Sequence, residues 1–126
     1  MSADEIKSIV KRFVDEPWNK GNVDIIDELC APEYTVTSIA SIGKGGREGL
    51  KDGIRNYRAA SPNLHAEVDV MIVEGNRAAY QWTMTEINEQ GKFVTMVGIT
   101  ILRFEKGKIV EDRNLYEPIS QEAPPA

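Results

Sequence analysis

Three side chains with polar tips follow one another at every second position near the end of the chain: Asp112, Asn114 and Tyr116. In a β-strand, successive side chains point to opposite faces, so these three would share one face. The neighbouring strand is expected over the apolar residues 93–102, so Asp112 would face an apolar cavity. Burial there would raise the pKa of its carboxyl group, which makes it the first candidate for acid-base chemistry in this sequence.

Three helices are expected to come before the sheet. Ser2 and Glu5 have the spacing of a capping box, and apolar residues then recur at helical period. A second helix is expected over residues 22–29, with Asn22 as its cap. A third is expected over residues 48–60, where one apolar face could lie across a sheet.

The rest of the chain has the pattern of β-strands joined by short turns. The strands are expected over residues 34–39, 64–74, 77–88, 92–104 and 108–116. Residues 1–120 are expected to form a single domain with one core, because a chain of 126 residues can bury about two-thirds of its unfolded surface. Residues 121–126 contain two prolines and are expected to be a disordered tail.

The strand over residues 92–104 is apolar on both faces. Phe93, Val97, Ile99 and Ile101 alternate with a second apolar set on the other side. Three helices can cover only one face of a sheet, so the other face needs a partner surface. We therefore expect a homodimer that packs sheet against sheet.

Composition narrows the function. The net charge is −5 and the basic residues are scattered, so nucleic-acid binding is not expected. The single cysteine, Cys30, and the single histidine, His65, cannot form a zinc site of the usual kind, and no cofactor motif is present, so neither a metal nor a cofactor is expected. No segment approaches the ~20 apolar residues of a membrane span and no signal peptide is visible, so no membrane association and a cytoplasmic location are expected.

Three short sequence motifs follow one another along the chain: WNKGN at residues 18–22, EGNR at 74–77 and RFEKGKIVE at 103–111. With three helices followed by an antiparallel meander, the chain resembles the SnoaL-like polyketide cyclase group of the nuclear transport factor 2-like superfamily over residues 3–117. The resemblance implies an α+β, cystatin-like cone in which three N-terminal helices pack on a curved antiparallel sheet. It also implies a deep pocket enclosed by the helices and the concave face of the sheet.

If Asp112 faces this implied pocket, strand parity selects the other lining residues. Trp18, Tyr34 and Tyr57 would close its mouth, and Pro17 would turn Trp18 away from the regular face of the first helix. Such a lining suits a flat, apolar small molecule of the polyketide, terpene or steroid kind. The expected substrate-binding residues are Trp18, Tyr34, Tyr57, Tyr80, Trp82, Met84, Met96, Thr100 and Tyr116.

The resemblance also implies where relatives carry their catalytic groups. The positions matching the steroid isomerase machinery hold Val14, Ser38 and Thr100, which cannot supply that chemistry. The positions matching the arginine and aspartates of limonene-type epoxide hydrolases hold Trp82, Met84 and Asn114. The inward aspartate of the aldol-type polyketide cyclases also matches Asn114.

Asp112, one pleat from Asn114, is the remaining acid. It is expected to remove a proton α to a carbonyl while Asn114, Thr100 or Tyr116 hydrogen-bonds the enolate, in a cofactor-independent cyclase or isomerase. Three alternatives stay open. The chain could be a non-catalytic ligand-binding or dimerisation module. It could be a lyase-like dehydratase or a hydrolase of the epoxide-hydrolase type. Asp112 could also lie at a solvated rim and pair with a cation.

Two further polar residues are weaker candidates. His65 alternates with acidic residues on its strand, which indicates a solvated face rather than a pocket. Glu86 has inward parity but lies beside a hairpin turn, where an exposed position is expected.

Overall fold

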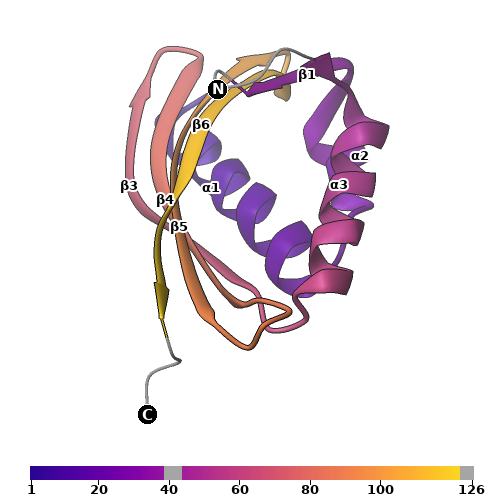
Figure 1. Cartoon of the computed structure of the whole chain (residues 1–126). Coiled ribbons are helices and arrows are strands. Elements are labelled where there is room, and N and C mark those ends of the chain that lie inside the picture. The colour runs from indigo at the N-terminus through magenta and orange to yellow at the C-terminus, as the bar shows by residue number, and fades with distance from the viewer. Residues whose placement is uncertain (39–43, 123–126) are drawn as a thin grey trace.

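The chain forms its helices first and then a single curved sheet (Figure 1). The computed structural model describes residues 1–38 and 44–122. The helical elements are α1 (Ala3–Val14), the π-helical turn η1 (Asp15–Asn19), α2 (Ile25–Leu29) and α3 (Arg47–Ala60). The strands are β1 (Cys30–Ser38), β2 (Lys44–Gly45), β3 (His65–Glu74), β4 (Arg77–Ile87), β5 (Phe93–Glu105) and β6 (Lys108–Glu122). The predicted α+β cone with three helices on a curved sheet is confirmed.

The start of α1 is the predicted capping box. The Ser2 hydroxyl accepts a hydrogen bond from the Glu5 backbone N–H at 3.1 Å, and the Glu5 carboxylate accepts one from the Ser2 N–H at 3.3 Å. The predicted cap of the second helix is wrong, because α2 starts at Ile25, after Asp24. Asn22 is instead part of the turn that follows Gly21, whose φ of 75° ends the helical run, and its backbone N–H bonds the carbonyl of residue 16.

Pro17 changes the geometry of the first helix as expected. A proline has no backbone N–H to donate, and the helix widens here into the π-helical turn η1. Pro17 itself is buried, whereas the Trp18 side chain is partly exposed and packs against the edge of the core. The widened turn therefore carries the indole out of the regular face of α1.

The sheet has the strand order β2-β1-β6-β5-β4-β3. All neighbouring pairs are antiparallel except β1 and β6, which run parallel and correct the expectation of a fully antiparallel sheet. A parallel pair needs a long connection, and here the whole meander lies between its two strands. The β5–β6 hairpin turns at Lys106 and Gly107, both with positive φ, which is the pattern of a tight type I′ turn.

β6 is longer than predicted. It continues to Glu122, and Gln121 and Glu122 lie opposite Val94 and Phe93 of β5. The expectation of a disordered tail from residue 121 is therefore wrong for these two residues. The remainder of that tail, residues 123–126, and the last residue of the predicted strand 34–39 lie outside the described residues.

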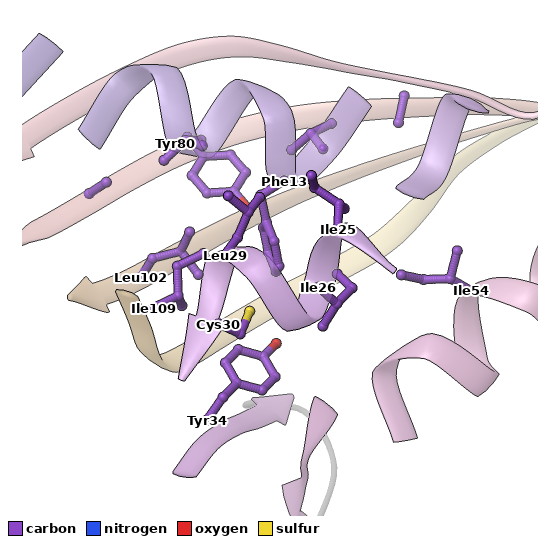
Figure 2. Packing of buried hydrophobic residues seen from close by; sticks show 14 of the residues in the cluster. Phe13, Ile25, Ile26, Leu29, Cys30, Tyr34, Ile54, Tyr80, Leu102 and Ile109 are labelled. Atoms are coloured by element: carbon purple, nitrogen blue, oxygen red, sulfur yellow. The ribbon is translucent and has the colours of Figure 1, made fainter. Parts of the chain in front are cut away.

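The core fills the space between the helices and the concave side of the sheet. α1 packs on β3 and β4, whereas α3 contacts β1 and η1 on the other side of the cone (Figure 1). Figure 2 shows side chains from α1, α2, β1, β4, β5 and β6 meeting in this cluster, with Cys30 and Tyr34 of β1 beneath the end of α2. Cys30 is buried, and burial raises the pKa of its thiol to about 12.

The convex face of the sheet stays apolar. Five large apolar side chains on this face are exposed to solvent: Val70, Ile72, Ile99, Ile101 and Leu115. The predicted second apolar face is therefore present. Within residues 1–38 and 44–122, no helix combines the length and the apolar character needed to cross a membrane.

Candidate active site

A cavity of about 450 Å³ lies inside the cone, between the helices and the concave face of the sheet. Its wall is mostly apolar and aromatic, and it receives residues from α1, η1, α3 and every long strand. All the predicted site residues line it except Tyr34. Those that line it are Trp18, Tyr57, Tyr80, Trp82, Met84, Met96, Thr100, Asp112, Asn114 and Tyr116.

Asp112 is the only carboxylate that the structure, over its described residues, places on this wall. It sits in the middle of the sheet, opposite Leu102 of β5 and Val36 of β1. Its side chain is only 4% exposed, while its neighbour Arg113 is exposed on the other face. The alternative of a solvated rim position is therefore wrong.

The Asp112 carboxylate accepts two hydrogen bonds. The Tyr34 hydroxyl donates to Oδ2 at 2.8 Å, and the Asn114 side-chain amide donates to Oδ1 at 3.2 Å. No cation among the described residues forms an ion pair with it. Burial raises the pKa of the Asp112 carboxyl from 3.8 to about 6, because the charged form loses its solvation and the hydrogen bonds from Tyr34 and Asn114 only partly offset that loss.

Tyr34 does not close the mouth, contrary to the prediction. It is 2% exposed and lies in the core beneath Asp112. Tyr34 lies on the same face of β1 as Val36, the residue opposite Asp112, so its phenol reaches the carboxylate from the neighbouring strand. Burial and the neighbouring Asp112 carboxylate raise the pKa of the Tyr34 phenol far above its usual value, so it stays protonated and remains a donor.

Asn114 lies one pleat nearer the mouth than Asp112, opposite Thr100 of β5 and beside Ser38 of β1. Its amide nitrogen bonds Asp112. Its carbonyl oxygen is buried and has no hydrogen-bond partner among the described residues. Buried polar atoms nearly always have a partner, so this oxygen needs an explanation.

A second set of residues shapes the wall on β4 and β5. The Trp82 indole N–H donates to the Thr100 hydroxyl at 2.9 Å. The indole lies directly over Gly98, where a Cβ atom would come within 2.2 Å of the ring. Gly98 is thus the residue that lets Trp82 lie flat against the sheet, a role that strand parity alone did not reveal.

The mouth is built from aromatic residues. Trp18 and Tyr57 meet edge to face with ring centroids 6.0 Å apart, and Trp82 and Tyr116 are tilted at the same separation. The Tyr57 hydroxyl donates to Glu86 at 2.8 Å. Partial burial, and then this hydrogen bond, raise the pKa of the phenol. Glu86 is therefore half-buried and accepts a hydrogen bond from Tyr57 at the mouth, so its predicted exposed position is wrong.

His65 is a solvated residue, as predicted, with a side chain 62% exposed. Among the described residues, no three His, Cys, Asp or Glu side chains are grouped so that they could hold a metal ion.

Several lining residues were not among the predicted ones. Phe13, Val36, Leu50 and Ala66 also face the cavity. The signal for Phe13 and Leu50 was present, because both belong to apolar helix faces. Sequence alone does not tell which part of such a face packs in the core and which part borders a hollow.

The positions that the resemblance matched to steroid isomerase machinery do meet in the cavity. Val14, Ser38 and Thr100 all line it. None of these three residues carries a carboxyl or a phenol, so the matched positions cannot supply that chemistry. Asp112 is left as the acidic group of this wall.

Comparison with known proteins agrees with this architecture. The family model described as SnoaL-like polyketide cyclase matches residues 8–123. A "putative polyketide cyclase" from Acidithiobacillus ferrooxidans is 23% identical, with a TM-score of 0.78 over 93% of this chain and 92% of its own. Another from Bacillus cereus is 27% identical, with a TM-score of 0.80 over 91% of this chain and 76% of its own.

The same fold occurs in a protein with another described chemistry. An LEH-like epoxide hydrolase from M. tuberculosis is 13% identical, with a TM-score of 0.73 over 90% of this chain and 84% of its own. No curated protein matches the chain. The solved structures thus agree on the cone, while their described activities differ.

Proposed function

Because the chain belongs to the SnoaL-like polyketide cyclase family, we propose that it binds an apolar carbonyl compound in the cone and that Asp112 acts on it as a general base. The observation that carries this proposal is the environment of Asp112. It is a buried carboxylate, without a cation among the described residues, on the wall of a cavity of about 450 Å³. A pKa of about 6 keeps it mostly ionised at neutral pH and still able to hold a proton.

The chemistry follows from these properties. The Asp112 carboxylate takes a proton from the carbon next to a carbonyl group, and the electron pair of the C–H bond passes to the carbonyl oxygen as an enolate. In a cyclisation, the enolate carbon then bonds a second carbonyl carbon of the same molecule, and the new alkoxide takes the proton back from Asp112. In an isomerisation, the proton returns to a different carbon. Asn114, Thr100 and Tyr116 are the nearby polar groups of the wall from which a donor to the enolate oxygen would come.

The test uses 2-tetralone, a flat apolar ketone with acidic α-protons. We expect the protein to catalyse exchange of these protons with D₂O, followed by NMR, and we expect Asp112→Asn to lower the rate by about 10²- to 10⁴-fold. The rate should rise with pH up to about 6 and then level off, because the base must be ionised. Asp52→Asn is the matched control, since it makes the same change on the exposed surface of α3.

Two results would count against a catalytic role. If Asp112→Asn exchanges the protons as fast as the unchanged protein, Asp112 is not the base. If 2-tetralone binds to the unchanged protein but its protons never exchange faster than in buffer, the non-catalytic binding module is the better reading.

We also propose that the chain forms a homodimer through the convex face of the sheet. The strand register places Val70, Gln81, Ile99 and Leu115 in one row across the sheet. The next row contains Ile72, Ala79 and Ile101, so Ala79 joins the apolar residues of β3 and β5 beside the polar Gln81. Exposed apolar side chains in adjacent rows form a continuous patch of the kind that marks an interaction site.

Charges at the two ends of this patch favour a second copy as its occupant. The row beyond one end of the patch holds Glu74, Arg77, Arg103 and Glu111. With Arg113 at the β6 end of the row of Ile72 and Ile101, arginines outnumber glutamates at this end of the patch, whereas Glu67 and Glu117 lie in the row beyond the other end. A two-fold axis in the plane of the interface, perpendicular to the strands, would bring the basic end of one copy onto the acidic end of the other.

Light scattering after gel filtration tests this assembly. We expect a mass twice that of the 14.1 kDa chain, and a fall to the single mass when Ile99→Lys places a charge at the centre of the patch. Gln90→Lys, on the exposed β4–β5 hairpin, should leave the mass unchanged. A single mass for the unchanged chain at micromolar concentration would rule this dimer out.

A further inference from the structure

The two partners of Asp112 share a chemical property. The Tyr34 hydroxyl and the Asn114 amide can each either donate or accept a hydrogen bond. Lysine or arginine could only donate, and would fix the carboxylate in its charged form. Asp112 is therefore held by groups that can serve it in both protonation states.

The ionised state is the one that the geometry describes. A carboxylate can only accept, so Asn114 must turn its NH₂ group toward Asp112 and its carbonyl oxygen away. The opposite orientation would place an amide oxygen against a negative charge. This requirement explains why the Asn114 carbonyl oxygen is buried without a partner among the described residues.

The protonated state reverses the requirement. Once Asp112 holds a proton, its O–H group needs an acceptor, and the Asn114 carbonyl oxygen is a free one on a side chain already within hydrogen-bond distance. A half-turn of the amide about its last side-chain bond exchanges the two ends. After that turn, the Asn114 carbonyl oxygen accepts a hydrogen bond from the protonated Asp112. The oxygen is then no longer buried without a partner, which is otherwise costly.

We propose that Asn114 turns its side-chain amide each time Asp112 takes up or releases a proton, so that it positions the acid in both states. This inference rests on the proposed role of Asp112 as a base and gives Asn114 a separate task. Asn114 is then a positioning residue that acts through Asp112. The donor to an enolate oxygen would come from Thr100 or Tyr116 instead, which narrows the three candidates.

The surroundings of Asp112 make the turn observable. The other titratable groups that face it are Cys30 and Tyr34 on β1 and Tyr80 on β4, and burial raises the pKa of each of them. Arg47 of α3 bonds the Cys30 carbonyl group. Because burial raises their pKa values, Cys30, Tyr34 and Tyr80 stay protonated between pH 4.5 and 8, so a transition near pH 6 at this site belongs to Asp112.

The experiment is NMR of the uniformly ¹³C,¹⁵N-labelled protein without substrate, between pH 4.5 and 8. The Asp112 ¹³Cγ signal reports its protonation, and the Asn114 side-chain NH₂ signals report the amide. We expect the NH₂ shifts to follow the midpoint of Asp112. The nuclear Overhauser effects of the NH₂ protons should move from Asp112 neighbours at high pH to Thr100 and Ser38 at low pH. In Asp112→Asn this change should disappear.

Asn19 is an internal control, because its amide is fixed in one orientation. Its NH₂ group donates to the Ala66 carbonyl and its oxygen accepts from the Ala66 N–H, both at 2.7 Å. The pattern of Overhauser effects at Asn19 should therefore stay constant over the same pH range.

A second readout uses the exchange of 2-tetralone. Asn114→Leu removes the donor to ionised Asp112, so the midpoint of the pH–rate profile should move to higher pH by roughly one pH unit. A merely structural role would lower the rate equally at all pH values. If this variant does not fold, the NMR titration of the unchanged protein still decides the question.

Two results would overturn the inference. If Asp112 titrates while the Overhauser effects of the Asn114 NH₂ protons stay constant, Asn114 is a fixed donor. If Asp112 does not titrate in this range, the protonated state that the turn serves is absent. A failure of the proposal that Asp112 is the base can be told apart from a failure of this inference. The first is measured by the exchange of 2-tetralone protons in Asp112→Asn, and the second by the Asn114 amide signals.

Discussion

Replacing Asp112 by asparagine should remove a loss of stability that the unchanged protein suffers as the pH rises toward neutral. The Asp112 carboxyl has a pKa of about 6 in the folded chain and 3.8 as its ordinary value. As the pH rises above 3.8, the unfolded chain loses this proton while the folded chain keeps it until about 6. The folded state therefore loses stability over this interval. The difference between the two pKa values corresponds to about 3 kcal/mol at pH 8, of which about 2 kcal/mol is lost between pH 4.5 and 8.

The assay is urea unfolding of both proteins between pH 4.5 and 8. Other carboxyl groups titrate equally in both, so the difference between their free energies of unfolding isolates Asp112. We expect the free energy of unfolding of Asp112→Asn to rise by about 2 kcal/mol relative to that of the unchanged protein as the pH increases over this range. Asp52→Asn, on the exposed surface, should show no such gain. A difference between Asp112→Asn and the unchanged protein that does not vary with pH would refute a raised pKa for Asp112.

Two further substitutions test the supports of the site. Gly98→Ala should destabilise the protein by roughly 1–3 kcal/mol in urea unfolding, because the new methyl group must displace the Trp82 ring. Gly53→Ala in α3 is its control and should be neutral or stabilising, since no atom lies within 4 Å of the added carbon. Tyr34→Phe removes a donor to the buried carboxylate, so it should raise the pKa of Asp112 and cost about 1–3 kcal/mol at pH 8 but less at pH 4.5. An equal loss at both pH values would show that the hydroxyl does not act through the charge of Asp112.

The order of the elements could be predicted because each carries a local signal. The capping box of Ser2 and Glu5 and the apolar period of α1 are decided within one or two turns. The parallel pairing of β1 with β6 could not be predicted in this way. It joins segments almost eighty residues apart, and their pairing depends on how the whole meander curves. The extension of β6 to Glu122 has the same origin, because β5 offers free edge groups up to Phe93.

The site shows the same division between local and long-range information. Strand parity correctly brought Asp112, Trp82 and Thr100 to one face. Parity does not give depth along the cone, so it placed Tyr34 at the mouth although it lies under Asp112. For Glu86, inward parity was correct and the neighbouring hairpin turn misled, since the sequence holds no sign that Tyr57 of α3 would bond its carboxylate.

The position of the acid on β6 determines which partners it can have. Exposure rises along the inward face of this strand, from buried Asp112 through partly buried Asn114 to Tyr116, which is 48% exposed. The strand therefore runs from the closed end of the cone toward its mouth. The resemblance to aldol-type cyclases placed the acid at residue 114, beside Thr100 and Ser38.

One pleat further in, about 7 Å deeper along the strand, the acid meets different neighbours. There the Tyr34 phenol can reach it from β1, and solvent cannot. Deeper burial raises the pKa of the acid, and the phenol and the Asn114 amide keep the ionised form accessible near neutral pH. An asparagine at residue 114 is compatible with an acid at residue 112, because its amide can donate to the Asp112 carboxylate. A second carboxylate there would face Asp112 at hydrogen-bond distance and push its pKa higher still, out of the range in which a base works at neutral pH.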